Sequence, residues 1–296
     1  MDLVRASHLY KVFGKNERQV IERLKAGESR EELASLGTAA VIDVSFEVAK
    51  GETFVVMGLS GSGKSTLIRM INGLWFPSEG TVEVAGKVVS DMNDAQLRAL
   101  RRDHVSMVFQ HFALLPHLTV RENAAYGLKL QGKLKQKERL EKANEWLNTV
   151  GLNGWGDKYP HQLSGGMQQR VGLARALAAE TDILLMDEAF SALDPLIRRE
   201  MQDQLLELQG ALNKTIIFIT HDLNEAMYLG DHIAVMRNGR VAQIGTSDEI
   251  LTQPADDYVA DFVQDVDRSR VLTASAVMRP TEAVVSRSAE PRRVQR

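Results

Sequence analysis

The chain has 296 residues, 44% of them hydrophobic and 25% charged, and its formal net charge is -3. This length can bury one large core or two smaller ones, and the composition is ordinary for a globular protein. The small net charge gives no reason to expect nucleic acid as a partner, and the absence of cysteine excludes disulfides, thiolate metal sites and cysteine nucleophiles. No apolar run approaches the roughly 20 residues that span a bilayer, and the start has no secretory-signal pattern. We therefore expect that any transport role requires a separate membrane partner.

The first fifty residues predict short strands on either side of an insertion. Residues 8–13 and 40–48 have the apolar character of strands, and residues 17–37 between them are rich in charge. Ser29 and Glu32 match a capping box, in which each side chain satisfies an otherwise free backbone amide. We expect this insertion to be a pair of short helices.

The middle of the chain predicts an alternation of strands and helices. Residues 53–57 form a buried strand, which leads through a glycine-rich loop into a helix over residues 64–72. Strand and turn follow over 80–89, and residues 110–164 are mainly helical. The clearest helix spans 136–150, because its apolar residues recur on one face.

The last third returns to strands. Residues 183–186 and 215–220 are apolar runs, each followed by a helix, which is typical of an α/β sheet. Two more short strands are predicted at 233–236 and 241–244. From about residue 265 the character changes, and residues 286–296 form a basic, polar tail that is too short to bury a core.

A phosphate-binding motif lies between the strand at 53–57 and the next helix. Residues 58–66 match G-x-x-x-x-G-K-[ST], whose glycines let backbone amides surround phosphates. Lys64 is expected to bind the β- and γ-phosphates of ATP, and Ser65 to bind Mg²⁺. The alternative is a glycine-rich turn with a chance lysine, which average composition produces in roughly one chain in a hundred. The predicted phosphate-binding residues are Gly58, Ser60, Gly61, Ser62, Gly63, Lys64, Ser65 and Thr66.

Two acidic residues follow the buried strand at 183–186. We predict that Asp187 binds Mg²⁺ and that Glu188 orients and deprotonates the attacking water. Acids at a strand end are more often helix caps or surface charges. On the same sheet as a phosphate loop, the catalytic interpretation is favoured.

Residues 163–170, Leu-Ser-Gly-Gly-Met-Gln-Gln-Arg, resemble the signature of ABC transporter ATPases, with Met167 in place of a glutamine. Other motifs of that family follow in order over residues 1 to about 265. Gln110 matches the glutamine loop, Asp194 ends the D-loop segment 191–194, and His221 matches the switch histidine. Phe13 stands where the family stacks an aromatic ring on adenine, and Tyr10 is a competitor.

The resemblance implies a fold and a shared site. The fold would be an α/β, RecA-like P-loop core with an N-terminal antiparallel β subdomain and a helical signature subdomain over about 110–165. Ser164, Gly165 and Gly166, with Gln168, would close over the γ-phosphate held by a second copy, in a head-to-tail homodimer. Glu188, His221 and Gln110 would be catalytic, and Ser65, Gln110 and Asp187 would hold Mg²⁺.

The resemblance also implies partners. These are transmembrane permease subunits and, indirectly, an external substrate-binding protein, with the ATPase at the cytoplasmic face of the membrane. Residues 112–117 either line the groove that receives a permease helix or pack in the core, and the residues alone do not favour one of the two.

Two features resemble one subfamily, the ATPases of glycine betaine, proline betaine and choline importers. One is the insertion at 17–37 and the other is the segment 186–198. In those proteins the segment matching 265–272 leads into a pair of CBS domains, of which only the opening, around 276–280, is expected here. The cargo could instead be another small solute such as an amino acid. A soluble DNA-repair ATPase would need a coiled coil or zinc module, and a non-catalytic nucleotide binder would lack one of the catalytic residues.

Overall fold

The computed structural model describes residues 2–110, 112–191 and 193–264. The expectations for the tail, including the CBS-like opening at 276–280, lie outside the described residues, as does one residue of the D-loop segment, Ala192.

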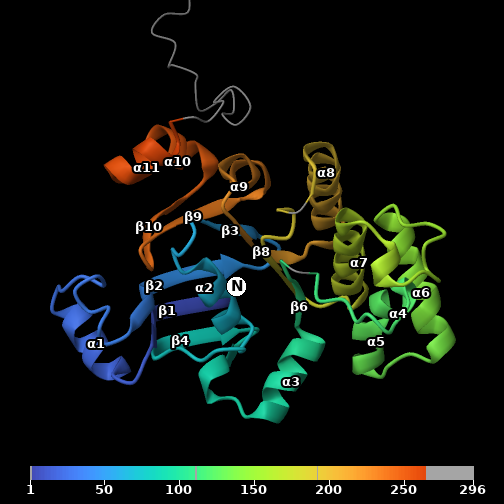
Figure 1. Ribbon diagram of the computed structural model, residues 1–296, viewed down its shortest axis with the longest axis horizontal. Helices are drawn as coiled ribbons and strands as arrows, with labels where there is room; N and C mark the ends of the chain where they lie inside the picture. Colours follow the sequence, from blue (N-terminus) through green and yellow to red (C-terminus); the bar gives the residue numbers. More distant parts are fainter. Residues whose placement is uncertain (1, 111, 192, 265–296) are drawn as a thin grey trace, which may run out of the picture.

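Two sheets form the centre of the molecule (Figure 1). The smaller is antiparallel, in the order β2-β1-β4-β5, because β1 pairs with β2 on one side and with β4 on the other. This arrangement confirms the predicted strands near the N-terminus. Its strands are β1 (Asp2–Phe13), β2 (Thr38–Ala49), β4 (Glu79–Val84) and β5 (Lys87–Val88).

The larger sheet has the order β10-β9-β3-β8-β7-β6, and all its neighbouring strands are parallel except the edge pair β9 and β10. Every residue of β3, β7 and β8 is buried, which explains their unbroken apolar sequences, since a parallel sheet is covered on both faces. The predicted α/β alternation is therefore confirmed. The strands are β3 (Thr53–Met57), β6 (Val105–Val108), β7 (Ile183–Asp187), β8 (Thr215–Thr220), β9 (His232–Arg237) and β10 (Arg240–Gly245).

Helices pack around this sheet (Figure 1). Helix α2 follows β3 after the glycine-rich loop, and α9 follows β8 after two residues. The carboxyl end of each strand therefore lies close to the start of a helix. The covering helices are α2 (Lys64–Ile71), α3 (Asp94–Asp103), α8 (Pro195–Leu212), α9 (Leu223–Leu229), α10 (Ser247–Thr252) and α11 (Asp257–Phe262).

A helical lobe lies to one side of the sheets, on the right in Figure 1. In α6 the residues Ala143 and Leu147 are buried and Leu140 and Trp146 pack against the same core, so the predicted face is confirmed. Residues 110–164 are less helical than expected, because loops occupy 112–119 and 150–164. The lobe contains α4 (Val120–Ala124), α5 (Tyr126–Gln131), α6 (Gln136–Thr149) and α7 (Gly165–Ala178).

The insertion contains one helix rather than the predicted pair. Helix α1 (Glu17–Lys25) buries an apolar face, and the Ser29–Glu32 capping box forms, with the Glu32 amide donating to Ser29 Oγ over 3.3 Å. The residues after it make turns, such as the one closed by the Leu36 amide on the Leu33 carbonyl at 2.9 Å. The prediction of a second helix was wrong: residues 30–36 form successive turns, closed by i to i+3 bonds such as that from the Ala34 amide to the Glu31 carbonyl at 3.3 Å, in place of the i to i+4 bonds of an α-helix.

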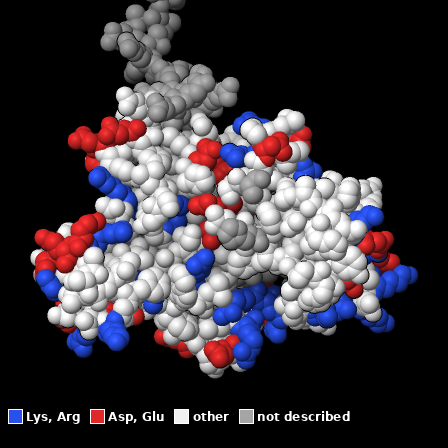
Figure 2. All heavy atoms as spheres, in the orientation of Figure 1, with Lys and Arg blue, Asp and Glu red and all other residues white. Residues whose placement is uncertain are grey.

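Charged side chains of both signs lie around the face shown in Figure 2. Acidic residues gather at the edges formed by α1 and by α11, and basic residues gather along the lower edge near α3. Within residues 2–110, 112–191 and 193–264, no helix is both long and apolar enough to cross a bilayer.

Candidate nucleotide site

The loop between β3 and α2 has a backbone that requires glycine. Gly63 has a φ of 103° and a Cβ there would lie 2.2 Å from the carbonyl oxygen of Ala40, while a Cβ on Gly58 would lie 2.3 Å from that of Met236. Gly63 is also the N-cap of α2 and provides no side-chain cap. The first amides of α2 are therefore left for an anion, which the helix dipole also attracts.

Lys64 is held inside this loop. Its Nζ donates to the carbonyl oxygens of Gly58 at 2.7 Å and Leu59 at 3.0 Å, and the residue is buried. Burial lowers the pKa of the Lys64 ammonium, and the nearby carboxylates of Glu188 and Asp187 oppose that shift. An anionic ligand would compensate the same desolvation more completely.

The two acids after the apolar part of β7 have different surroundings. Asp187 is buried and accepts a hydrogen bond from the Ser65 hydroxyl at 3.2 Å. Burial raises the pKa of the Asp187 carboxyl, and the bond from Ser65 partly offsets this. Glu188 has a positive φ of 47°, and its amide donates to the Ile219 carbonyl at 3.0 Å. This backbone turns the Glu188 side chain away from the strand.

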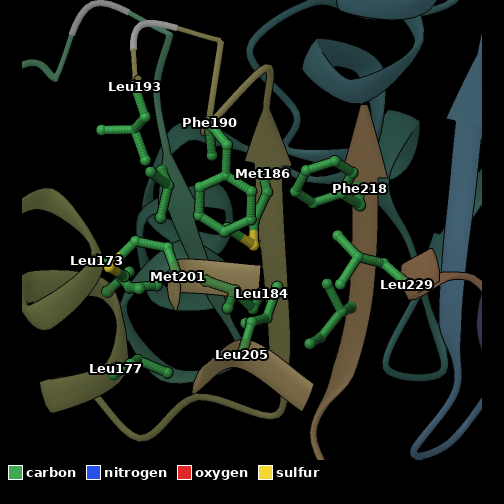
Figure 3. Close-up of a cluster of buried hydrophobic side chains, with 14 of the residues drawn as sticks. Leu173, Leu177, Leu184, Met186, Phe190, Leu193, Met201, Leu205, Phe218 and Leu229 are labelled. Atoms are coloured by element: carbon green, nitrogen blue, oxygen red, sulfur yellow. The ribbon is translucent and has the colours of Figure 1, made fainter. Parts of the chain in front are cut away.

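The core beneath this strand end fixes its position. Figure 3 shows Leu184 and Met186 of β7 packed among side chains from α7, α8 and β8, including Leu173 and Phe218. Phe190 is also buried there. The chain is therefore anchored in the core both before and after the acidic pair Asp187 and Glu188.

Three predicted residues meet at the carboxyl edge of the sheet. Gln110 follows β6 and donates from Nε2 to Glu188 Oε2 at 3.1 Å, and His221, which follows β8, has Nδ1 3.3 Å from the same oxygen. Parallel strands end at one edge, so residues 78 and 33 positions from Glu188 in the chain become its neighbours there. A carboxylate with these two partners is held in a defined orientation.

A cavity of about 770 Å³ joins these groups to the phosphate loop. Phe13 lines this cavity, is 37% exposed and meets Trp75 edge to face, with the ring centres 5.1 Å apart. Tyr10, the competitor, is only 5% exposed and packs with the α1 cluster. The predicted residues that line the cavity are Phe13, Ser60, Gly61, Gly63, Lys64, Ser65, Thr66, Gln110, Glu188 and His221.

The signature residues lie elsewhere. Ser164 is the N-cap of α7 and accepts a bond from the Met167 amide at 3.3 Å, and Gly165 follows as an exposed residue. Gln168 donates within the chain to the carbonyls of Pro160 and Leu163 at 3.1 and 3.2 Å, so it shapes the preceding loop. Of the described residues that line the 770 Å³ cavity, none belongs to 164–168.

The D-loop residue Asp194 caps α8 by accepting from the Ile197 amide at 3.1 Å. Arg198, which the sequence did not single out, joins this loop to the switch segment. It donates to the Leu193 carbonyl and to Asp222 Oδ2, both at 3.2 Å. Only tertiary structure brings these segments together, so no local signal marks Arg198.

The loop at 112–117 is half-exposed or exposed throughout. Arg175 of α7 holds it by donating to the carbonyls of Ala113 at 2.7 Å and Phe112 at 3.0 Å, and burial lowers the pKa of that guanidinium. Leu114 packs partly against the core, as the core-packing interpretation expects, and the exposure of its neighbours leaves the groove interpretation a prediction.

The chain is similar to known proteins. A family model described as ABC transporter matches residues 41–191. The glycine betaine transport ATP-binding protein OpuAA of Bacillus subtilis is 54% identical over 283 residues, covering 95% of this chain and 68% of that protein. The glycine betaine/proline betaine transport system ATP-binding protein ProV of Escherichia coli is 52% identical, with 93% and 69% covered. The trimethylamine N-oxide transport system ATP-binding protein TmoW of Ruegeria pomeroyi is 48% identical, with 94% and 82% covered.

A solved dimer of the ATP-binding cassette MJ0796, in a post-hydrolysis state with ADP and Pi, has a TM-score of 0.72 and 32% identity and covers 82% of this chain and 98% of that one. This likeness confirms the predicted cassette fold with its phosphate-loop core. The chain belongs to the ABC transporter family and is one of its ATP-binding, ATP-hydrolysing subunits.

Proposed function

We propose that this chain drives the import of glycine betaine or a related quaternary amine by hydrolysing ATP for a separate permease. The observation that carries the ATPase part is Glu188, which faces the same cavity as Lys64 and Ser65. The substrate class is supported by the names of relatives that are 54% and 52% identical, because a cassette of this family does not itself contact the cargo.

Hydrolysis requires a base, a positioned water and a clamp on the γ-phosphate. Glu188 takes the proton of the water, and Gln110 and His221 hold that carboxylate and the water in line with the phosphorus atom. The loop amides and Lys64 stabilise the charge that develops on the γ-phosphate oxygens. Thr66 and the loop residues Ser60 to Gly63 surround the other phosphates, and Phe13 stacks on adenine.

The oxygen atoms near the end of β7 fit Mg²⁺. Ser65 Oγ and Asp187 Oδ1 lie 3.2 Å apart, and Gln110 retains its amide oxygen because its nitrogen donates to Glu188. Hydroxyl, carboxylate and amide oxygens are the hard ligands this ion prefers. Bound there, Mg²⁺ would neutralise charge on the β- and γ-phosphates.

The site is completed by a second copy. The exposed start of α7, with Ser164, Gly165 and Gly166, offers a hydroxyl and amides to an anion but lies outside the cavity of its own chain. In a head-to-tail dimer these groups would cover the γ-phosphate of the partner, and two-fold symmetry would produce two such sites. The dimeric MJ0796 cassette supports this arrangement.

The organisation of the importer follows from the same proposal. Residues 1–265 form the nucleotide-binding domain, with the signature subdomain at about 110–165 and the insertion at 17–37. Transmembrane subunits dock on the lobe side, where residues 112–117 are accessible, and the complex lies at the cytoplasmic face of the membrane with an external substrate-binding protein on the other side.

The relative TmoW favours trimethylamine N-oxide as a second candidate cargo. TmoW, which is named for that compound, is 48% identical over nearly the same span. Trimethylamine N-oxide is small and resembles glycine betaine in its methylated nitrogen. The same relatives argue against an amino acid without such a group.

The test is ATP-driven uptake into vesicles that contain this chain with the permease subunits co-purified from its native membrane. We expect glycine betaine, carnitine, choline or trimethylamine N-oxide to stimulate hydrolysis and to accumulate, and Glu188→Gln to abolish both. Stimulation by an unmethylated amino acid alone would contradict the substrate class and leave the ATPase assignment intact.

A further inference from the structure

Arg30 lies in the insertion, on a segment that the fold holds firmly. The Ser29–Glu32 capping bonds precede and follow it, with the Ser29 amide donating to Glu32 Oε2 at 2.8 Å. Three residues further on, Leu33 is fully buried against α1, beside Leu24. The backbone around Arg30 is thus anchored on both sides, although no second helix forms.

The Arg30 side chain reaches the phosphate loop. It lines the 770 Å³ nucleotide cavity together with Leu59, Ser60 and Gly61. It also lines an adjoining hollow of about 380 Å³ that borders the same three residues and Arg237. Because Arg30 shares the lining of both hollows with Leu59, Ser60 and Gly61, it lies near the first half of the loop that surrounds the phosphates.

The cations around the cavity differ in what they already bind. Lys64 donates to two carbonyl oxygens of its own loop. Arg30 has its Nε 3.6 Å from Glu31 Oε1, which is longer than a hydrogen bond, and its side chain is 27% exposed. Among the described residues that line this cavity, Arg30 and Lys64 are the only lysine or arginine side chains. An arginine with unused donors at the edge of a phosphate site has the planar fork that matches phosphate oxygens.

We propose that Arg30 is a nucleotide-contact residue supplied by the insertion, and that its guanidinium binds phosphate oxygens of ATP beside Lys64. The inference rests on the nucleotide site proposed above and adds a residue that lies outside every motif of that site. It also gives the insertion at 17–37 a role, since this segment carries a cation to the cavity.

The experiment compares Arg30→Gln, Arg30→Lys and a matched control, Arg18→Gln. Arg18 is on the same insertion, has a side chain that is 93% exposed and does not line the cavity. Binding of ATP and of adenosine is measured by calorimetry at a protein concentration where the chain is monomeric. We expect Arg30→Gln to weaken ATP binding roughly 3- to 10-fold, as for a partly exposed ion pair, and to leave the affinity for adenosine unchanged. Arg30→Lys keeps the charge but lacks the planar guanidinium, so its ATP affinity should lie between those of the parent chain and Arg30→Gln.

Three outcomes would overturn the inference. The first is unchanged ATP affinity in Arg30→Gln while Lys64→Ala loses it, which leaves the nucleotide site intact. The second is an equal effect of Arg18→Gln. The third is an effect on ATP-dependent dimerisation alone, which would make Arg30 an interface residue. If Lys64→Ala also kept full affinity, the nucleotide site itself would be wrong.

Discussion

Helices α2 and α7 both begin with glycine-rich turns that can bind an anion, yet their N-termini are built differently. The start of α2 has no side-chain cap, and the buried Lys64 is beside it. The start of α7 is capped by Ser164, and Gly165 after it is exposed. The first belongs to a cavity within its own chain, and the second faces solvent.

The difference shows which part of the site one chain can complete. The end at α2 brings together the phosphate loop, the oxygens proposed to hold Mg²⁺ and Glu188, so we expect a single copy to bind ATP. The end at α7 contributes no described residue to that cavity, and in the proposed dimer its groups would contact a nucleotide held by another copy. Substitutions at the α2 end should leave the start of α7 unchanged, and substitutions at the start of α7 should leave ATP binding by one chain intact.

The largest effect is expected for Glu188→Gln. Removal of the base should lower the turnover number about 10²- to 10⁴-fold, while ATP affinity stays within a factor of about two. Steady-state phosphate release and calorimetry measure the two quantities. Glu141→Gln, at a surface pair with Lys137, is the matched control and should change neither. A comparable loss in that control would show that the effect is not specific to the base.

The ATP affinity of Lys64→Ala tests the phosphate loop at the start of α2. Because the lysine is buried and charge-assisted bonds are strong, we expect ATP to bind about 10- to 100-fold more weakly. The start of α7 is distant, so its limited-proteolysis pattern should stay the same. Unchanged affinity would mean that the loop binds nucleotide without this ammonium.

Phe13→Ala tests the adenine end of the same cavity. Loss of an aromatic face should weaken ATP binding about 3- to 10-fold and leave the affinity for inorganic triphosphate unchanged. Tyr10→Phe is the control, because Tyr10 is buried outside the cavity and only its hydroxyl is removed. If Tyr10→Phe weakened ATP more than Phe13→Ala, the stacking residue would be Tyr10.

A smaller effect, on stability, is expected for Asp187→Asn without nucleotide. Burial raises the pKa of Asp187 in the folded chain above the ordinary 3.8. A raised pKa means that the carboxylate destabilises the fold once pH rises through that value. Thermal melts should therefore show Asp187→Asn more stable than the parent near neutral pH, with the difference vanishing below the ordinary pKa. A difference that persisted under acidic conditions would exclude this cause.

Most of the core and of the site could be predicted from the sequence, because their signals are local. The strand over 53–57 is fully buried and is followed at once by its glycines, and Glu188 closes an apolar run. What could not be predicted depends on distant contacts. The second helix of the insertion had its capping box, yet turns form there instead. Arg198 contacts Asp222, and Arg30 lines a cavity with Leu59 to Gly61, so both meet segments that are distant in the chain.

The open choice between Phe13 and Tyr10 has the same origin. Both are aromatic residues of β1, and only the packing of α1 against Tyr10 buries one of them. Periodicity along a strand assigns faces, but it does not say which face a distant helix covers.

A negative charge added at the start of α7 tests most directly whether one chain binds ATP and two chains hydrolyse it. In the Glu188→Gln background, Ser164→Asp keeps a residue suited to the N-cap but adds a negative charge facing the γ-phosphate, whereas Ser164→Asn keeps the cap without charge. Molar mass by light scattering with saturating ATP is the measurement. We predict a dimer with two nucleotides for Glu188→Gln alone and with Ser164→Asn, and a monomer with one bound ATP for Ser164→Asp. A Ser164→Asp protein that dimerises as well as its asparagine counterpart would contradict the shared site.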